Sequence, residues 1–169
     1  ARSNYISVLN LTIKELEKMG KRVVVIPQTT YAGSADAEVA KQVIRGTAAV
    51  VGPQPETLDL FLQQFDQIDT IIGMRLHSCL IALMRGVPAI SISYLPKCSE
   101  IMSDLGLSNY VIDVERVQSE QILSLVEQLD GTSNRRSYFK RFEDNRSLFK
   151  GNENVDFVAW LGADLKGRG

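Results

Sequence analysis

The chain has little of the chemistry on which disulfide-stabilised and metal-dependent proteins rely. Its 169 residues include one histidine, His77, and two cysteines, Cys79 and Cys98, which are not in a CxxC arrangement. Two cysteines at this spacing predict neither a disulfide framework nor a zinc site. We therefore expect no essential metal and a reducing compartment, the cytoplasm.

Long apolar runs and an excess of charge are also missing. No stretch approaches the roughly 18 apolar residues of a membrane-spanning helix, and residues 1–10 lack the charged-then-apolar pattern of a signal peptide. The formal net charge is -1, so no overall field attracts the molecule to nucleic acid, and we expect no nucleic-acid partner. Any ligand must be recognised by a local site.

What the chain does contain is an alternation of short, continuous apolar runs with amphipathic segments. The apolar runs predict strands at residues 22–26, 48–51, 69–73, 87–93 and 110–112. The amphipathic segments predict helices at residues 5–19, 36–44, 55–65, 77–85, 97–105 and 119–129, with Asp36 as the cap of the second. Continuous apolar runs are typical of strands that are buried on both faces. We therefore expect one open, parallel, Rossmann-like α/β sheet with helices on both faces.

In sheets of this kind ligands bind beyond the carboxyl ends of the strands. The segment IIGMRLHS, residues 71–78, lies at such an end: the predicted strand stops at Gly73 and a helix begins near His77. Arg75 and His77 then lie where the N–H groups of the new helix point outward, an arrangement that favours a phosphate or carboxylate ligand. The alternative is a capping histidine and a surface arginine in a salt bridge.

A second segment, SYLPKCSE at residues 93–100, follows the next strand. Lys97 begins a helix there, where a cation is unfavourable against the helix dipole unless a bound anion compensates it. The alternative is a lysine that is simply solvated. Cys79 and Cys98 flank these loops, and we expect both to be buried, inert thiols.

These segments together carry a family resemblance. The run GMRLHSCLIALMRGVPAISISYLPK, residues 73–97, resembles the signature of the polysaccharide pyruvyl transferases: G-M-R-L-H-S, an apolar helix, G-V-P, an apolar strand and S-Y-x-P-K. PQTT at residues 27–30 and DLGLSNYVID at residues 104–113 agree with the same family. The family more often has an acidic residue before Pro-Lys, where this chain has Leu95.

The resemblance implies a fold and an activity. The fold would resemble the C-terminal half of the two-domain GT-B glycosyltransferases, with an N-terminal domain upstream that supplies the other wall of the cleft. The activity would be transfer of the enolpyruvyl group of phosphoenolpyruvate, without a cofactor, onto sugar hydroxyls of a cell-surface polysaccharide or exopolysaccharide as a ketal. By motif position Arg75 and His77 carry over as catalytic and donor-binding residues, and Lys97 as a site residue. The further substrate-binding candidates are Gln28, Ser78 and Tyr94.

Two other functions fit the predicted fold less well. The nucleotide-sugar glycosyltransferases and epimerases of this shape generally carry a glutamate in the helix before G-x-P, and residues 77–85 contain no acid. A flavodoxin-like signalling module would need an aspartate at the carboxyl end of a strand. The predicted strands instead end at Pro27, Gly52, Gly73 and Ser93.

We assign residues 1–130 to the donor-binding domain and residues 131–169 to a helical extension packed on it. The extension contains the basic run NRRSYFKRFEDNRSLFK, residues 134–150. One interpretation is a membrane-surface helix that brings the enzyme to a lipid-linked glycan at the inner face of the membrane. The other, favoured because Glu143 and Asp144 interrupt the basic face, is a helix whose aromatic residues pack back onto the domain. Those aromatic residues are Tyr138, Phe139, Phe142 and Phe149. Trp160, in residues 154–165, is expected to cover the same region.

Overall fold

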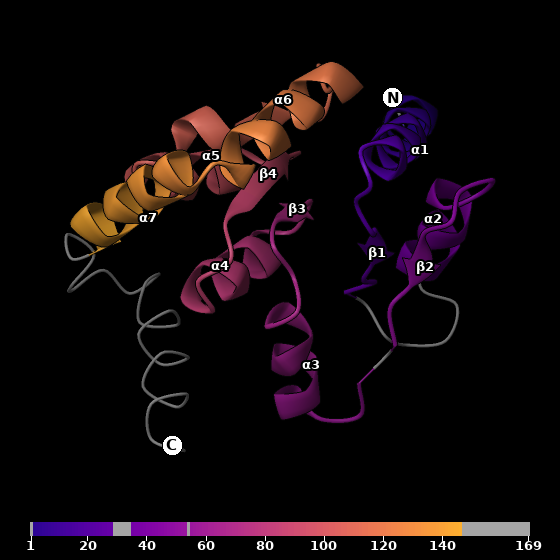
Figure 1. Ribbon diagram of the computed structural model, residues 1–169, viewed down its shortest axis with the longest axis horizontal. Helices are drawn as coiled ribbons and strands as arrows, with labels where there is room; N and C mark the ends of the chain where they lie inside the picture. The colour runs from indigo at the N-terminus through magenta and orange to yellow at the C-terminus, as the bar shows by residue number, and fades with distance from the viewer. Residues whose placement is uncertain (1, 29–34, 54, 147–169) are drawn as a thin grey trace.

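The computed structural model describes residues 2–28, 35–53 and 55–146. It consists of short parallel strands surrounded by helices (Figure 1). The strands are β1 (Val24–Val25), β2 (Val50–Val51), β3 (Ile71–Gly73), β4 (Ala89–Ser93) and β5 (Val111–Asp113). The helices are α1 (Arg2–Lys18), α2 (Ala35–Val43), α3 (Leu58–Phe65), α4 (Leu76–Met84), α5 (Pro96–Asp104), the 3₁₀ turn η1 (Ser108–Tyr110), α6 (Ser119–Asp130) and α7 (Thr132–Arg146). Each pairing among these strands is parallel, and the α/β class predicted from the sequence is confirmed.

The strands form two sheets, not the single sheet that the sequence predicts. One sheet pairs β1 with β2, and the other has the order β3-β4-β5. The apolar runs locate the strands, although β2 is exposed and only β4 is buried along its whole length. They carry no information on which strand edges meet, because pairing depends on backbone groups that every residue has.

The core is centred on β4, all five residues of which are buried. Helices α4 and α5 pack against this strand, and α1 packs against both α2 and α6. Within the described ranges no helix is long and apolar enough to cross a membrane.

Helix α7 completes the core at the start of β4. Strand β5 first pairs with β4 at Ser91, so it does not reach Ala89. The Tyr138 hydroxyl takes that place: it donates a hydrogen bond to the Ala89 carbonyl (2.8 Å) and accepts one from the Ala89 N–H (2.9 Å). Burial raises the pKa of Tyr138, which keeps its proton available for this bond. Phe142 is buried beside it, whereas Phe149 and Trp160 lie outside the described residues.

Several helices begin at residues other than those predicted. Helix α3 starts at Leu58, not at residue 55, because the side chain of Thr57 accepts a hydrogen bond from the Leu60 N–H and caps it. Asp36 is the second residue of α2 and not its cap. Helices α4 and α5 each start one residue early, after Arg75 and Leu95, which form no side-chain cap.

Candidate functional site

The turn between β3 and α4 brings a helix unusually close to the end of a strand. A Cβ atom added to Gly73 would lie 2.6 Å from Cys79 Sγ, which is less than any normal contact. Glycine at this position therefore lets the first turn of α4 pack directly on the last residue of β3. This contact fixes where the N-terminus of α4, and with it Arg75, lies relative to the sheet.

Arg75 occupies the N-cap position of α4, with extended backbone and no side-chain capping bond. Its guanidinium is paired with Asp36: Nη2 lies 3.0 Å from each carboxylate oxygen. The pair joins the start of α4 to the first turn of α2, and the Arg75 side chain remains 46% exposed. The salt bridge that the sequence left open as an alternative is thus present, although a bound phosphate or carboxylate would compete with Asp36 for the same cation.

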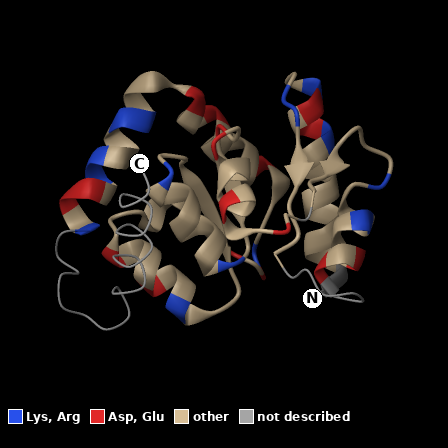
Figure 2. Cartoon of the chain, turned by 90° about the horizontal axis from the view of Figure 1, so that it is seen from below, with Lys and Arg blue, Asp and Glu red and all other residues tan. Residues whose placement is uncertain are grey.

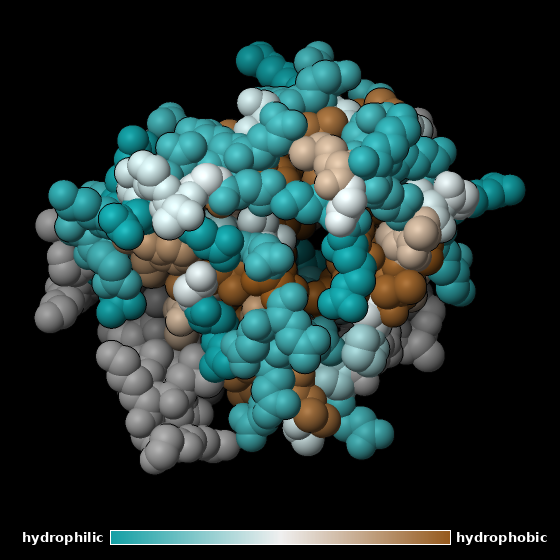
Figure 3. Space-filling view, viewed as in Figure 1, coloured by the Kyte–Doolittle hydropathy of each residue, from teal (hydrophilic) through white to brown (hydrophobic). Residues whose placement is uncertain are grey.

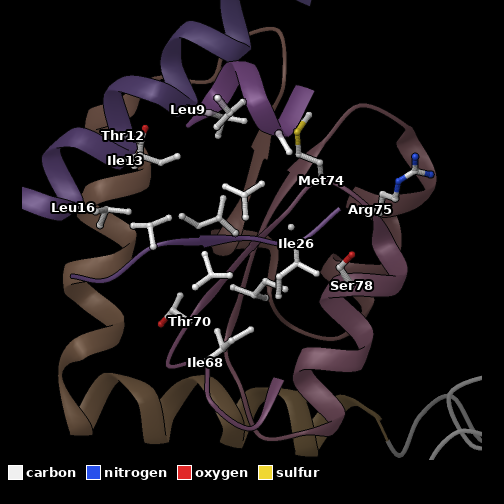
Figure 4. A pocket seen from close by; sticks show the side chains of 18 of the residues that line it. Leu9, Thr12, Ile13, Leu16, Ile26, Ile68, Thr70, Met74, Arg75 and Ser78 are labelled. Atoms are coloured by element: carbon white, nitrogen blue, oxygen red, sulfur yellow. The ribbon is translucent and has the colours of Figure 1, made fainter. Parts of the chain in front are cut away.

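Ser78 lies beside Arg75 in the first turn of α4 (Figure 4). Its side chain is 2% exposed, and its Oγ makes no hydrogen bond to any other described group of the protein. Buried hydroxyls almost always have a partner, because an unsatisfied one costs about 1–3 kcal/mol. A polar ligand atom that reached the N-terminus of α4 would satisfy it.

Four of the six predicted site residues line one cavity of about 870 Å³. They are Gln28, Arg75, Ser78 and Tyr94. Gln28 is half-buried, and its Nε2 donates to the Ile26 carbonyl at 3.4 Å, whereas Tyr94 is 53% exposed. His77 and Lys97 are exposed in the first turns of α4 and α5 and do not line the cavity. The roles of all six residues stay predictions.

The cavity itself lies between β1 and β3, and its lining combines aliphatic side chains with polar and charged ones (Figures 3 and 4). The Arg75–Asp36 pair lies at the carboxyl ends of these strands, and a second ion pair, between Lys21 and Asp130 (2.7 Å), lies at their amino ends. From β1 the chain progresses outward to β2 and then crosses over to β3, so the direction of winding changes at this cavity. Open α/β sheets bind ligands outside the carboxyl ends of the strands at such a switch point, which here is the end that carries the Arg75–Asp36 pair.

Neither the cavity nor the role of Asp36 was predicted from the sequence. A signal for Asp36 did exist, because it follows the loop at the carboxyl end of β1 just as Arg75 follows β3. Loops at the carboxyl ends of parallel strands meet at one edge of a sheet, so an acid and an arginine in two of them are candidates for a pair.

Cys79 and Cys98 are buried, as predicted, and both face Ser91. Burial, reinforced by the nearby Cys98, raises the pKa of Cys79 to about 12, and the hydrogen bond with Ser91 only partly offsets this. Because the thiolate is the reactive form, Cys79 is inert near neutral pH.

Positively and negatively charged residues are interspersed along the described part of the chain (Figure 2). In the part of the chain that the structure describes, no three His, Cys, Asp or Glu side chains gather as metal ligands. Activity without a metal, and the expected lack of a nucleic-acid partner, stay predictions.

Comparison with known proteins identifies the segment around this site. Residues 39–96 match the family model described as polysaccharide pyruvyl transferase. No curated protein and no solved structure matches the chain significantly, so the likeness to the GT-B fold stays a prediction. The matched segment runs from α2 to the first residue of α5 and includes Arg75, His77 and Ser78. The match confirms, for the segment that contains the candidate site, the family predicted from the sequence: polysaccharide pyruvyl transferase.

Proposed function

We propose that the chain is the donor-binding half of an enzyme that transfers the enolpyruvyl group of phosphoenolpyruvate onto sugar hydroxyls of a polysaccharide as a ketal. One observation carries the proposal. Arg75 and the buried, unpartnered Ser78 hydroxyl lie together at the uncapped N-terminus of α4, within the segment that matches the family. A guanidinium, a hydroxyl and helix N–H groups are the donors that a phosphate or carboxylate requires.

Asp36 has a role in this proposal because it holds the guanidinium at the site before the donor arrives. An arginine that is already oriented loses less conformational freedom on binding, although the donor must then displace the carboxylate. Lys97, exposed in the first turn of α5, supplies a second cation at the same edge of the sheet. Positive charge held in place for the departing phosphate is the largest catalytic contribution that we expect.

The reaction begins when the methylene carbon of phosphoenolpyruvate gains a proton and C2 becomes electrophilic. A sugar hydroxyl bonds to C2 and releases its proton. The bond from C2 to the phosphate oxygen then breaks, inorganic phosphate leaves, and a second hydroxyl bonds to C2, releases its proton and closes the ketal. His77 serves either as the proton donor or as a phosphate ligand. His77→Ala abolishes turnover in the first case and mainly raises the Michaelis constant in the second.

An N-terminal domain supplies the acceptor site and the other wall of the cleft in this proposal. The chain by itself should therefore have no turnover, and joining it to that domain should restore activity. Ketal formation by the chain alone, measured as phosphate release with a saccharide acceptor, would contradict this arrangement.

The donor site is tested by titrating phosphoenolpyruvate into full-length enzyme that carries Arg75→Ala. A charge-assisted contact contributes about 1.5–3 kcal/mol, so donor affinity should fall roughly 10- to 150-fold. Arg75→Lys should also bind weakly, because an ammonium lacks the bidentate fork. Lys97→Ala should weaken binding without unfolding the protein.

The same helix provides a matched control for Arg75. Arg85 is the C-cap residue of α4 and is paired with Asp66, so Arg85→Ala removes an ion-paired arginine from the opposite end. Its donor affinity should stay at the wild-type value. Near-normal affinity and turnover in both Arg75→Ala and His77→Ala would show that the donor binds elsewhere.

A further inference from the structure

We propose that the cavity between β1 and β3 is the slot for a sixth parallel strand, supplied by polypeptide that leads into the N-terminus of α1. This slot has a volume of about 870 Å³. Its two long walls are strand edges: among the described residues β1 pairs only with β2, and β3 pairs only with β4. The proposal goes beyond the donor site and does not depend on it.

The backbone groups of β1 that face the slot follow from its pairing with β2. The Val23 carbonyl accepts from Val50 N–H (3.4 Å) and the Val25 carbonyl accepts from Gly52 N–H (2.8 Å), so both point to β2. Alternate residues of a strand direct their N–H and C=O groups to opposite edges. Val24 and Ile26 therefore present theirs to the slot.

The opposite wall has the same pattern. The Ile71 N–H donates to the Pro88 carbonyl (3.0 Å) beside β4, so the backbone groups of Thr70 and Ile72 point into the slot. The two strands also run in the same direction, because Arg75 after β3 meets Asp36 after β1. The Ile26 carbonyl accepts a long side-chain bond from Gln28 (3.4 Å), but these edges pair with no further described strand. Two such parallel edges form a template for one more parallel strand.

The place of α1 among the helices on one side of the slot is consistent with one further strand. Helix α1 lies between α2 and α6 and contacts both, and residues of all three line the slot. Packed helices are about 8–10 Å apart and paired strands about 4.7–4.9 Å, so one helix covers about two strand spacings. By these general spacings, a helix placed between α2 and α6 corresponds to one further strand between β1 and β3.

The position of α1 also argues against direct pairing of β1 with β3. A buried hydrogen bond between Thr12 Oγ1 and Ser119 Oγ (3.1 Å) fixes α1 to α6, and the Lys21–Asp130 ion pair joins the start of β1 to the end of α6. Closing the slot would require α1 to leave the position that these contacts define. An inserted strand leaves all of them intact.

Topology identifies the source of the strand. A strand in the slot that continues into α1 and then β1 forms a strand–helix–strand unit, the connection that joins parallel neighbours. The strand order then becomes β2, β1, the inserted strand, β3, β4 and β5. In doubly wound sheets of this order the winding direction changes at the central strand. The side chains of Leu9, Ile13 and Leu16 line the slot, so the inserted strand should be apolar on the face toward α1. Its carboxyl end would bring the turn into α1 next to Arg75.

Hydrogen exchange on the chain as it stands is the first test. The amides of Val24, Ile26 and Ile72 should exchange about 100-fold faster than those of Ile90 and Ile92 in the central strand β4, because nothing accepts their hydrogen bonds. Protection equal to that of Ile90 in a monomer would mean that β1 and β3 pair directly, and the proposal would be wrong. The same protection in a dimer, detected by light scattering, would assign the slot to a second copy and would also overturn it.

The second test supplies a strand. The probe is a six-residue segment, Thr-Val-Ile-Val-Thr-Val, fused through Gly-Asp to Ala1. We expect a higher midpoint of thermal unfolding and slowed exchange at Val24, Ile26 and Ile72. The matched control has proline at two central positions of the segment, which removes the N–H donors and should cancel both effects. An extension that changes neither the midpoint nor the exchange, or a proline control that equals it, would overturn the proposal.

Discussion

The close contact between Gly73 and Cys79 fixes the position of α4, and a methyl group added at Gly73 tests this directly. In Gly73→Ala the new Cβ would lie 2.6 Å from Cys79 Sγ. Normal contacts are about 3.5–4.0 Å, so the atoms must separate by about 1 Å. Cys79 is completely buried and cannot turn away, and overpacking of this kind costs about 1–3 kcal/mol. The first turn of α4 should move, and donor affinity should fall because Arg75 moves with it.

Removing the thiol should relieve the clash. Cys79→Ala alone loses one buried atom and should cost about 1 kcal/mol. In the double mutant the added methyl group, which replaces a hydrogen of Gly73, occupies the space of Sγ. Most of the cost of Gly73→Ala should then disappear, which gives a coupling free energy of about 1–3 kcal/mol.

Urea unfolding of the wild type, both single mutants and the double mutant measures this coupling, and donor titration of the corresponding full-length enzymes measures its effect on the site. Gly131→Ala is the matched control, because its added Cβ would meet nothing closer than 3.5 Å. Free energies that add within about 0.5 kcal/mol would refute the reasoning, because independent sites behave in that way.

Three further predictions concern the stability of the fold. Tyr138→Phe keeps the ring but leaves the buried N–H and C=O of Ala89 without a partner, so the free energy of unfolding measured in urea should fall by about 2–4 kcal/mol. Tyr94→Phe, at an exposed position, should leave the free energy of unfolding almost unchanged. Above pH 9 the unfolded chain loses the Cys79 proton that the folded chain retains to about pH 12, so stability should fall as pH rises through this window. Cys79 contributes at most about 1.4 kcal/mol per pH unit to the decrease in the free energy of unfolding. If this free energy fell equally steeply with pH in Cys79→Ala, the prediction would be contradicted. Thr57→Ala removes the cap of α3 and should cost about 0.5–2 kcal/mol, and a loss indistinguishable from zero would mean that the cap is not needed.

The sequence predicted the elements well and their assembly less well. Apolar runs overlap all five strands, although only β4 is buried along its whole length and β2 is exposed. Glycines closed the helices where expected, as at Gly86 and Gly106, whose positive φ angles of 73° and 74° suit residues without a Cβ. The separation of β1 from β3 left no trace in the pattern, because apolar periodicity does not specify how helices such as α1 and α6 pack across the sheet.

The candidate site was predicted in part for a similar reason. Arg75 and Ser78 could be found because they lie in one short motif at the end of one strand. The partner of Arg75 is 39 residues away in sequence, and nothing local at Asp36 distinguishes an ion-pair partner from a helix cap. The burial of Ser78 was equally hidden, because it depends on how closely α4 approaches β3.

The hydrogen bonds between Tyr138 and Ala89 have a consequence for shortening this unit or transferring it to another protein. The Tyr138 side chain, on helix α7, forms the hydrogen bonds with Ala89 that a neighbouring strand would otherwise form. The edge of the sheet is therefore completed by a residue that follows all of its strands in sequence. A chain shortened at residue 130 would retain every strand and still lose the partner of a buried backbone pair, together with the ring of Phe142. A graft of this α/β unit onto another protein must therefore carry α7 with it.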